Sequence, residues 1–185
     1  MFDYLIGTVI DSESNTISLL TDFKIAFLIN VIDNSFFKVN DETKIYTHLF
    51  KGEENIALYG FNNKVDRFLF SELIKINGIG PKTAINILKK ATSHGLITLI
   101  KNKDLNGLQK IGSIGAKADR IYYELKNKVV NLEGYNYKYP DVFDALINLG
   151  YKAQEIFPIL NSLEGNLDSS SALKEVIVRL KDNEQ

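Results

Sequence analysis

The sequence predicts an α+β chain of several domains, in which a five-stranded barrel precedes an all-helical region and a three-helix end. Residues 1–61 are rich in β-branched and aromatic residues, and from residue 65 onward apolar residues recur every three or four positions. Net charge also changes along the chain, from −5 over residues 1–61 to +7 over 62–134 and −3 over 135–185. A basic middle between acidic flanks is typical of a nucleic-acid-binding core, although lysines that merely solvate helix faces are a simpler explanation.

The first domain, residues 1–61, is expected to be a small closed barrel of the OB type. Five segments with the composition of strands alternate with turn-forming residues: 2–10, 17–20, 25–32, 44–50 and 55–61. Their short connections favour antiparallel neighbours, and five short strands suit a closed barrel. OB barrels often bind single-stranded nucleic acid, but the acidity of this one argues against a groove of that kind.

The last turn of the predicted barrel carries two adjacent carboxylates, Glu53 and Glu54. Most pairs of this kind are solvated turn residues. Magnesium binding is a weaker interpretation, because no further Asp/Glu cluster with metal-ligand spacing accompanies the pair.

The basic domain, residues 62–134, opens with a predicted amphipathic helix, a tight turn, and a second helix that begins at Pro81. Gly78 and Gly80 are expected to adopt backbone angles closed to other residues, so that main chain approaches a ligand closely. Free N–H groups at the helix start bind phosphate oxygens well, and Lys82 adds a full charge beside them. A tight helix corner that binds nothing is the simpler alternative.

A second copy of this hairpin lies 35 residues further on. The matched pairs are Ile76 and Ile111, Ile79 and Ile114, Gly80 and Gly115, and Lys82 and Lys117. Two phosphate-binding turns in tandem suit the two strands of one duplex. The copy departs from the first at Ser113, in the place of Gly78, and at Ala116, in the place of Pro81. It is also one residue short, so we expect it to hold phosphate less well.

In these motifs the sequence resembles the helix-hairpin-helix family, and residues 60–88 (GFNNKVDRFLFSELIKINGIGPKTAINIL) are similar, more narrowly, to the RuvA family of Holliday-junction-binding proteins. The resemblance covers nearly the whole chain. It implies a non-catalytic subunit that holds a four-way DNA junction open, independently of base sequence, for branch migration in recombination, repair and the SOS response. The residues that it implies at the DNA backbone are Gly78, Ile79, Gly80, Lys82, Thr83, Ser113, Gly115, Lys117 and Arg120. It also implies that Glu53 and Glu54 form an acidic pin near the crossover.

The same resemblance implies the assembly and the partners. We expect a homotetramer, or two stacked tetramers that make an octamer. A RuvB-type hexameric ATPase is the expected motor, and a RuvC-type resolvase is a further expected partner. ATP is then used by the motor, so no cofactor is expected for this chain.

The last domain, residues 141–185, follows a short predicted linker at 135–140. Three apolar stripes predict three short helices around one core, and Leu149 belongs to the first stripe. By resemblance this UBA-like domain binds the motor. The candidate contacts are Leu149, Gly150 and Tyr151. Apolar residues in so small a domain more often belong to its core.

Several other classes of protein find little support. The absence of Cys excludes disulfides and thiolate metal sites. No apolar run is long enough to span a bilayer, and Asp3 does not suit a signal peptide, so we expect a cytoplasmic protein without membrane contact. The GIGPKT segment lacks the GK[ST] of a Walker sequence. His48, in a predicted strand, and His94, in a predicted loop, share no catalytic motif, so no catalytic or metal-binding residue is expected.

Two alternatives from other classes stay open. Tandem hairpins of this kind also accompany structure-specific nucleases, in which Glu53 and Glu54 would be Mg²⁺ ligands. The other alternative is a protein-interaction scaffold whose basic middle serves solubility alone.

Overall fold

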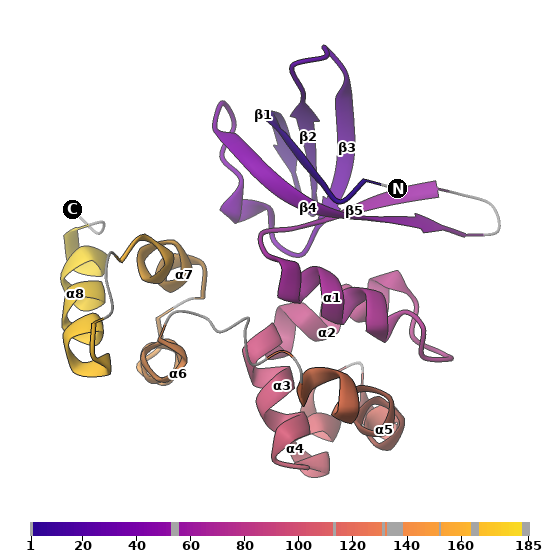
Figure 1. The fold of residues 1–185 in the computed structure, drawn as a ribbon, viewed down its shortest axis with the longest axis vertical. Helices are drawn as coiled ribbons and strands as arrows, with labels where there is room; N and C mark the ends of the chain where they lie inside the picture. The colour runs from indigo at the N-terminus through magenta and orange to yellow at the C-terminus, as the bar shows by residue number, and fades with distance from the viewer. Residues whose placement is uncertain are drawn as a thin grey trace. The chain divides into compact units, whose positions relative to one another are not determined.

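The computed structural model groups the chain into two compact units, Met1–Asn131 and Leu132–Gln185. It describes residues 2–52, 56–112, 114–130, 132, 139–151, 153–163 and 167–182. The first unit contains a barrel and the helices that follow it, and the second contains three helices (Figure 1). The predicted fold class is thereby confirmed, and the predicted border at residue 61 falls inside the first unit.

Five strands close the barrel in the order β1-β2-β3-β5-β4. Their bounds are β1 Tyr4–Glu13, β2 Thr16–Leu20, β3 Ala26–Val31, β4 Glu42–Lys51 and β5 Ile56–Phe61. The expectation that all neighbours are antiparallel is wrong for one pair, because β3 and β5 run parallel, with Asn30 opposite Tyr59. A closed ring with an odd number of strands cannot alternate direction all the way round, so one parallel pair is unavoidable. A short 3₁₀ helix, Asn34–Phe36, lies in the connection between β3 and β4.

The barrel packs on the first helix, α1 (Lys64–Leu73), through the buried ring of Phe70. This ring lies 4.8 Å from Tyr59, 5.0 Å from Phe61 and 5.4 Å from His48, measured between ring centroids. Arg67 adds an ion pair to Asp3 at 2.5 Å. Because aromatic rings bury large apolar areas, this junction accounts for the grouping of the barrel and the helices into one unit.

Both histidines lie in regular structure. His48 sits in β4 against Phe70, and its pKa is lowered by burial and then by the charges of Arg67 and Lys75. His94 was expected in a loop, but it lies in the first turn of α3 (Ser93–Lys101), which begins two residues after the preceding helix ends.

The remaining helices of the first unit follow one another closely. They are α2 Pro81–Ala91, α3 Ser93–Lys101, α4 Leu105–Lys110, a 3₁₀ turn at Gly115–Lys117, and α5 Ala118–Val129. These helices pack on one another, with α1 against α2, α2 against α3 and α3 against α5. Their buried residues include Leu73 of α1, Ile87 of α2, Ile100 of α3 and Ile121 of α5. Each predicted hairpin therefore has a helix before it and a helix after it, as expected.

Asp66 joins the start of α1 to the start of α3. Its carboxylate accepts hydrogen bonds from the Ser93 hydroxyl and, at 3.0 Å, from Asn63 Nδ2, while Asn63 caps the helix by accepting from the Asp66 N–H. Burial raises the pKa of Asp66 to about 6, and the two hydrogen bonds only partly offset this effect.

This raised pKa predicts that stability declines as pH rises. Since the folded protein holds the Asp66 proton more tightly than the unfolded chain, the stabilisation is fully present below about pH 4 and is lost through about pH 6. Between these limits we expect the free energy of unfolding of the wild type to fall by about 2 kcal/mol relative to Asp66→Asn, because partial exposure of the residue reduces the full effect of about 3 kcal/mol. Urea unfolding at pH 4, 5, 6 and 7 measures the difference. Parallel pH profiles for the two proteins would contradict it.

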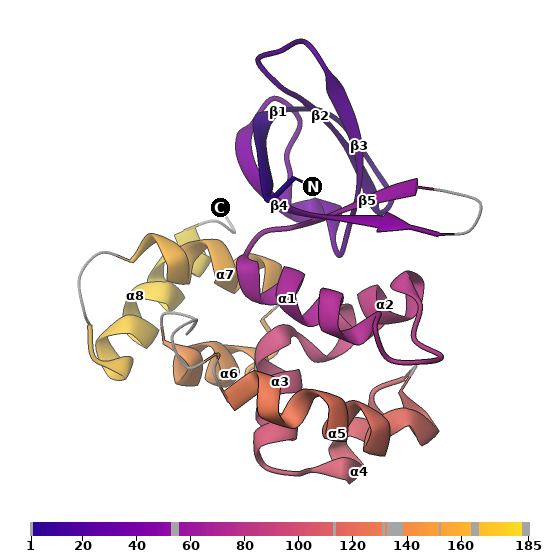
Figure 2. The same cartoon turned by 45° about the vertical axis from the view of Figure 1, so that its right-hand side comes forward.

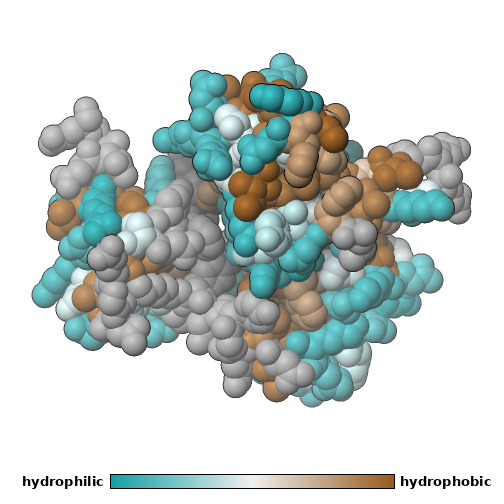
Figure 3. Space-filling model, turned by 45° about the horizontal axis from the view of Figure 1, so that its top comes forward, coloured by the Kyte–Doolittle hydropathy of each residue, from teal (hydrophilic) through white to brown (hydrophobic). Residues whose placement is uncertain are grey.

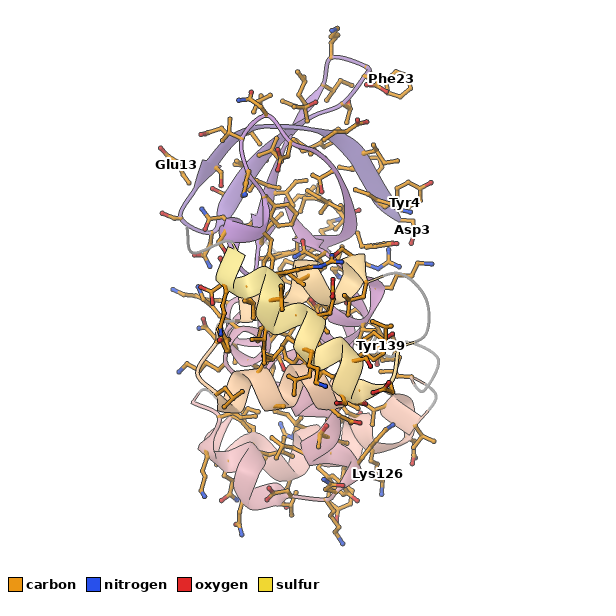
Figure 4. The ribbon with its side chains drawn as sticks, turned by 90° about the vertical axis from the view of Figure 1, so that its left-hand side faces the viewer. Asp3, Tyr4, Glu13, Phe23, Lys126 and Tyr139 are labelled. Atoms are coloured by element: carbon orange, nitrogen blue, oxygen red, sulfur yellow. The ribbon has the colours of Figure 1, made fainter. Side chains whose placement is uncertain are left out.

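The second unit is built from α6 (Pro140–Asn148), α7 (Ala153–Ser162) and α8 (Ser169–Asp182). Their buried side chains form one core. These core residues are Val142, Phe143, Leu146, Ile156, Ile159, Leu160, Leu163, Ala172, Val176 and Leu180. Asp168 caps α8 by accepting from the Ser171 N–H at 3.0 Å. Tyr139, labelled in Figure 4, packs on this core, and its hydroxyl accepts from the Leu167 N–H at 2.6 Å.

The three predicted partner-binding residues, Leu149, Gly150 and Tyr151, directly follow the last residue of α6. Leu149 was expected in an apolar stripe of the core, but it is 65% exposed because the helix stops at this point. Gly150 has φ +92°, and the Tyr151 N–H donates to Leu146 O at 3.1 Å, which is the Schellman arrangement of a helix end. The helix end therefore explains why a glycine stands at position 150, without any role in binding. The exposed Leu149 side chain is available to a partner.

The described helices contain no segment that combines the length and the apolar character needed to cross a membrane.

Candidate nucleic-acid interface

In hairpin 1, residues 77–80, only one of the two glycines has the left-handed backbone conformation. Gly78 has φ +82°, a conformation that favours glycine, whereas Gly80 has φ −87° and caps α2 in an extended conformation. The expectation of unusual backbone angles is therefore confirmed for Gly78 and wrong for Gly80. A Cβ at Gly80 would meet no atom within 4 Å, so the space beside its main chain is open.

The start of α2 offers unpaired donors beside this open space. Within the first turn of α2, the first N–H with a backbone acceptor is that of Ala84, which donates to Gly80 O at 2.9 Å. The N–H groups of Lys82 and Thr83 have no acceptor among the described residues, and no side chain caps the helix. Together with the exposed Lys82 side chain they present positive charge to an anion.

Ile79 has a different role from its neighbours. Its side chain is buried in the core, and its N–H already donates to Ile76 O at 2.9 Å. Ile114 repeats this arrangement in the second copy, where its N–H donates to Ile111 O at 3.0 Å. These two isoleucines anchor the hairpins from inside, so Ile79 offers neither a side chain nor an amide to a ligand.

Hairpin 2, residues 112–115, continues differently from hairpin 1. Gly115 has φ +47°, and a turn of 3₁₀ helix, Gly115–Lys117, precedes α5. In hairpin 1 the α-helix begins directly at Pro81. The change in winding lies at the place where the two copies lose their sequence register. Ser113 lies outside the described residues.

The two hairpins touch through the cations of the second copy. Lys117 Nζ donates to Gly78 O at 2.8 Å, and Arg120 Nη1 donates to Asn77 O at 3.1 Å. Figures 1 and 2 both show the α1–α2 turn and the start of α5 at the same side of the helical region. The carbonyl groups of Asn77 and Gly78 were not predicted as partners, because no local pattern indicates a contact between residues 39 and 43 positions apart.

Two other lysines of the basic region, Lys75 and Lys128, form ion pairs with a carboxylate of the protein itself. Glu72 is buried and forms ion pairs with Lys75 and, at 2.7 Å, with Lys128 at the far end of α5. Burial raises the pKa of Glu72, but the hydrogen bonds from Lys128 and Lys75 outweigh it and leave the pKa below its ordinary value. In the part of the chain that the structure describes, Lys82, Lys117 and Arg120 form no ion pair with a carboxylate. Their charges are available to a phosphate.

The predicted acidic pin, Glu53 and Glu54, lies outside the described residues. Among the residues that are described, no three His, Cys, Asp or Glu side chains gather in a way that could hold a metal ion.

Comparison with known proteins divides the first compact unit between two family models and matches the second unit with a third. Family models match residues 1–60 as the RuvA N-terminal domain, residues 70–127 as a SAM-like helix-hairpin-helix tandem, and residues 138–181 as the RuvA C-terminal domain. Residues 1–60 and 138–181 thus frame the two hairpins.

Similar proteins, matched over nearly their whole length, occur in several bacteria. The chain is 38% identical to a protein of Thermodesulfovibrio yellowstonii, over 95% of this chain and 94% of that protein. It is 33% identical to a protein of Pediococcus pentosaceus, over 92% and 93%, and 30% identical to a protein of Phytoplasma mali, over 99% and 100%. All three are named Holliday junction branch migration complex subunit RuvA. The fold, the paired hairpins and these similarities together show that the chain belongs to the RuvA family.

Proposed function

We propose that this protein is a non-catalytic subunit that binds four-way DNA junctions and holds them open for branch migration. The observation that carries the proposal is the pairing of two hairpins, with free α2 amides and Lys82 on one and Lys117 and Arg120 on the other. Two such turns side by side suit the two backbones of one duplex arm. Ser113 lies outside the described residues and stays a prediction. The predicted DNA contacts that stay candidates are Gly78, Gly80, Lys82, Thr83, Gly115, Lys117 and Arg120.

Contacts of this kind make binding independent of base sequence. Amides and lysines directed at phosphates read no base edge, and branch migration must proceed through any sequence. They also make binding sensitive to salt. If an assembly neutralises six to ten phosphates, its affinity falls by roughly 10³ to 10⁵ between about 50 and 200 mM salt. Titrations of a labelled junction at four salt concentrations measure the slope, and a flat response would contradict phosphate contacts.

Four copies around one junction, or eight in two stacked tetramers, complete the proposed assembly. Exposed apolar side chains on the barrel support association with further copies, since apolar surface left in water favours contact. Figure 3 shows apolar side chains over the barrel, and Ile6, Ile10 and Leu28 are about half exposed or more. In this assembly the Glu53 and Glu54 tips would meet near the crossover and repel the converging phosphates.

The second unit is proposed to bind a RuvB-type hexameric ATPase, which uses ATP in place of this chain. Its exposed Leu149 at the end of α6 supports such a contact, and Tyr151 beside it is partly buried against the core. A RuvC-type resolvase is a further proposed partner on the junction.

Light scattering of the protein with and without a synthetic four-way junction tests the proposal. We expect four or eight copies per junction, and a band shift that favours the junction over a linear duplex of the same length. Equal affinity for the two DNAs would overturn the proposal. Incubation with Mg²⁺ in the same mixtures separates it from the nuclease alternative, because cleavage products that disappear on Glu53→Gln would favour an enzyme.

A further inference from the structure

Cations cross between the two hairpins in both directions. On hairpin 1, Lys117 and Arg120 of the second copy donate to the carbonyl oxygens of Gly78 and Asn77. On hairpin 2, Lys90 from the last turn of α2 lies so close to Gly112 that a Cβ built there would be 2.7 Å from Nζ. Each hairpin therefore has a cation from the other copy at its first residues, hydrogen-bonded at hairpin 1 and placed beside Gly112 at hairpin 2.

These contacts restrain hairpin 1 without using up charge. A hydrogen bond from a cation to a carbonyl is stronger than one between neutral groups, and it leaves the net positive charge in place. Because the carbonyl oxygens of Asn77 and Gly78 are drawn toward α5, the turn is held in one orientation, including the glycine conformation at Gly78. The unpaired N–H groups at the start of α2 then keep a fixed orientation toward a ligand.

We propose that Lys117, Arg120 and Lys90 are positioning residues that brace the two hairpins into one rigid element. The spacing between the two phosphate-binding turns is then set before DNA arrives, which lowers the ordering cost of binding. The role of the brace in DNA binding rests on the proposed function, whereas the brace itself belongs to the DNA-free protein. If the three cations served only as phosphate contacts, removing them would leave the DNA-free hairpins unchanged.

Amide hydrogen exchange in the DNA-free protein tests the brace on hairpin 1. The reporter is the Ile79 N–H, which is protected by its bond to Ile76 O. We expect its exchange to be about 2- to 10-fold faster in Lys117→Met and in Arg120→Met, because each variant removes one hydrogen bond that restrains the turn. Lys117→Arg should restore the wild-type rate, and Lys82→Met should not change it. Wild-type exchange at Ile79 in both Met variants, at unchanged unfolding temperature, overturns the brace.

A variant that moves a cation without removing it tests hairpin 2. Gly112→Ala would displace the Lys90 ammonium while net charge stays the same, and Gly112 has no positive φ that alanine would strain. We expect faster exchange of the Ile114 N–H in Gly112→Ala and in Lys90→Met. Lys89→Met, one residue away on the same exposed turn, is the matched control and should leave the rate unchanged.

Junction binding by combined variants tests what the brace does for DNA. If Lys117 positions hairpin 1, then Lys82 contributes less once Lys117 is gone, so Lys82→Met with Lys117→Met loses less affinity than the product of the single losses. Losses that multiply would show independent contacts and overturn the positioning role. If the wild type bound no junction at all, the proposed function would fail, and the exchange rates would still decide the brace.

Discussion

Charge reversal at the two hairpins, Lys82→Glu combined with Lys117→Glu, is expected to abolish four-way junction binding, with a loss of affinity of at least about 100-fold. Each reversal replaces attraction of a phosphate by repulsion, and it does so in every copy of the assembly. Lys117 also holds Gly78 O, so its loss disturbs hairpin 1 as well. Band shifts at constant salt measure the effect.

Lys24→Glu is the matched control for this double variant. Lys24 is exposed in the turn between β2 and β3, in the barrel rather than the helical region, and its reversal changes charge in the same direction. We expect junction affinity within about twofold of the wild type, since a screened charge away from the contact contributes little. Wild-type binding by the double variant would instead favour the interaction scaffold, in which the basic middle serves solubility alone.

Phe70→Ala is expected to lower the free energy of unfolding of the first unit by about 3 to 5 kcal/mol. Phe70 is fully buried and contacts the rings of Tyr59, Phe61 and His48, so the variant leaves a cavity between the barrel and α1. A loss of this size is a large part of the stability of a small domain. Urea unfolding followed by circular dichroism measures it.

Phe23→Ala is the control for the same chemical change at the surface. Phe23 is 87% exposed, and in Figure 4 it projects from the barrel at the turn between β2 and β3. Its replacement should alter the free energy of unfolding by no more than about 0.5 kcal/mol. A loss for Phe70→Ala as small as that for Phe23→Ala would show that the barrel and α1 fold without this junction.

Local patterns predicted the elements well because local forces form them. The strand segments, the apolar periodicity of α1 and the helix start at Pro81 each depend on residues close in sequence, and all appear in the structure. The expectation for Gly80 failed because glycine at a turn has two separate uses. At Gly78 it supplies a positive φ, and at Gly80 it leaves open space beside ordinary backbone.

Contacts between distant residues could not be predicted in the same way. The parallel pairing of β3 with β5 follows from closing an odd number of strands, which no single strand reveals. Leu149 is exposed because α6 ends before it, whereas the apolar periodicity in the sequence continues past the end of the helix. The ion pair between Lys128 and Glu72 joins α5 to α1, two helices that lie far apart in the sequence.

The order of the domains, the repeated hairpin and the basic charge of the middle region could all be predicted from the sequence, because composition, periodicity and spacing depend on neighbouring residues. Two features needed the folded chain: which lysines stay available to a phosphate, and the hydrogen bonds from the cations of one hairpin to the carbonyl groups of the other. Those outcomes depend on which side chains meet across the folded core, and a hydrogen bond between residues some 40 positions apart exists only once the chain has brought them within 3 Å or so.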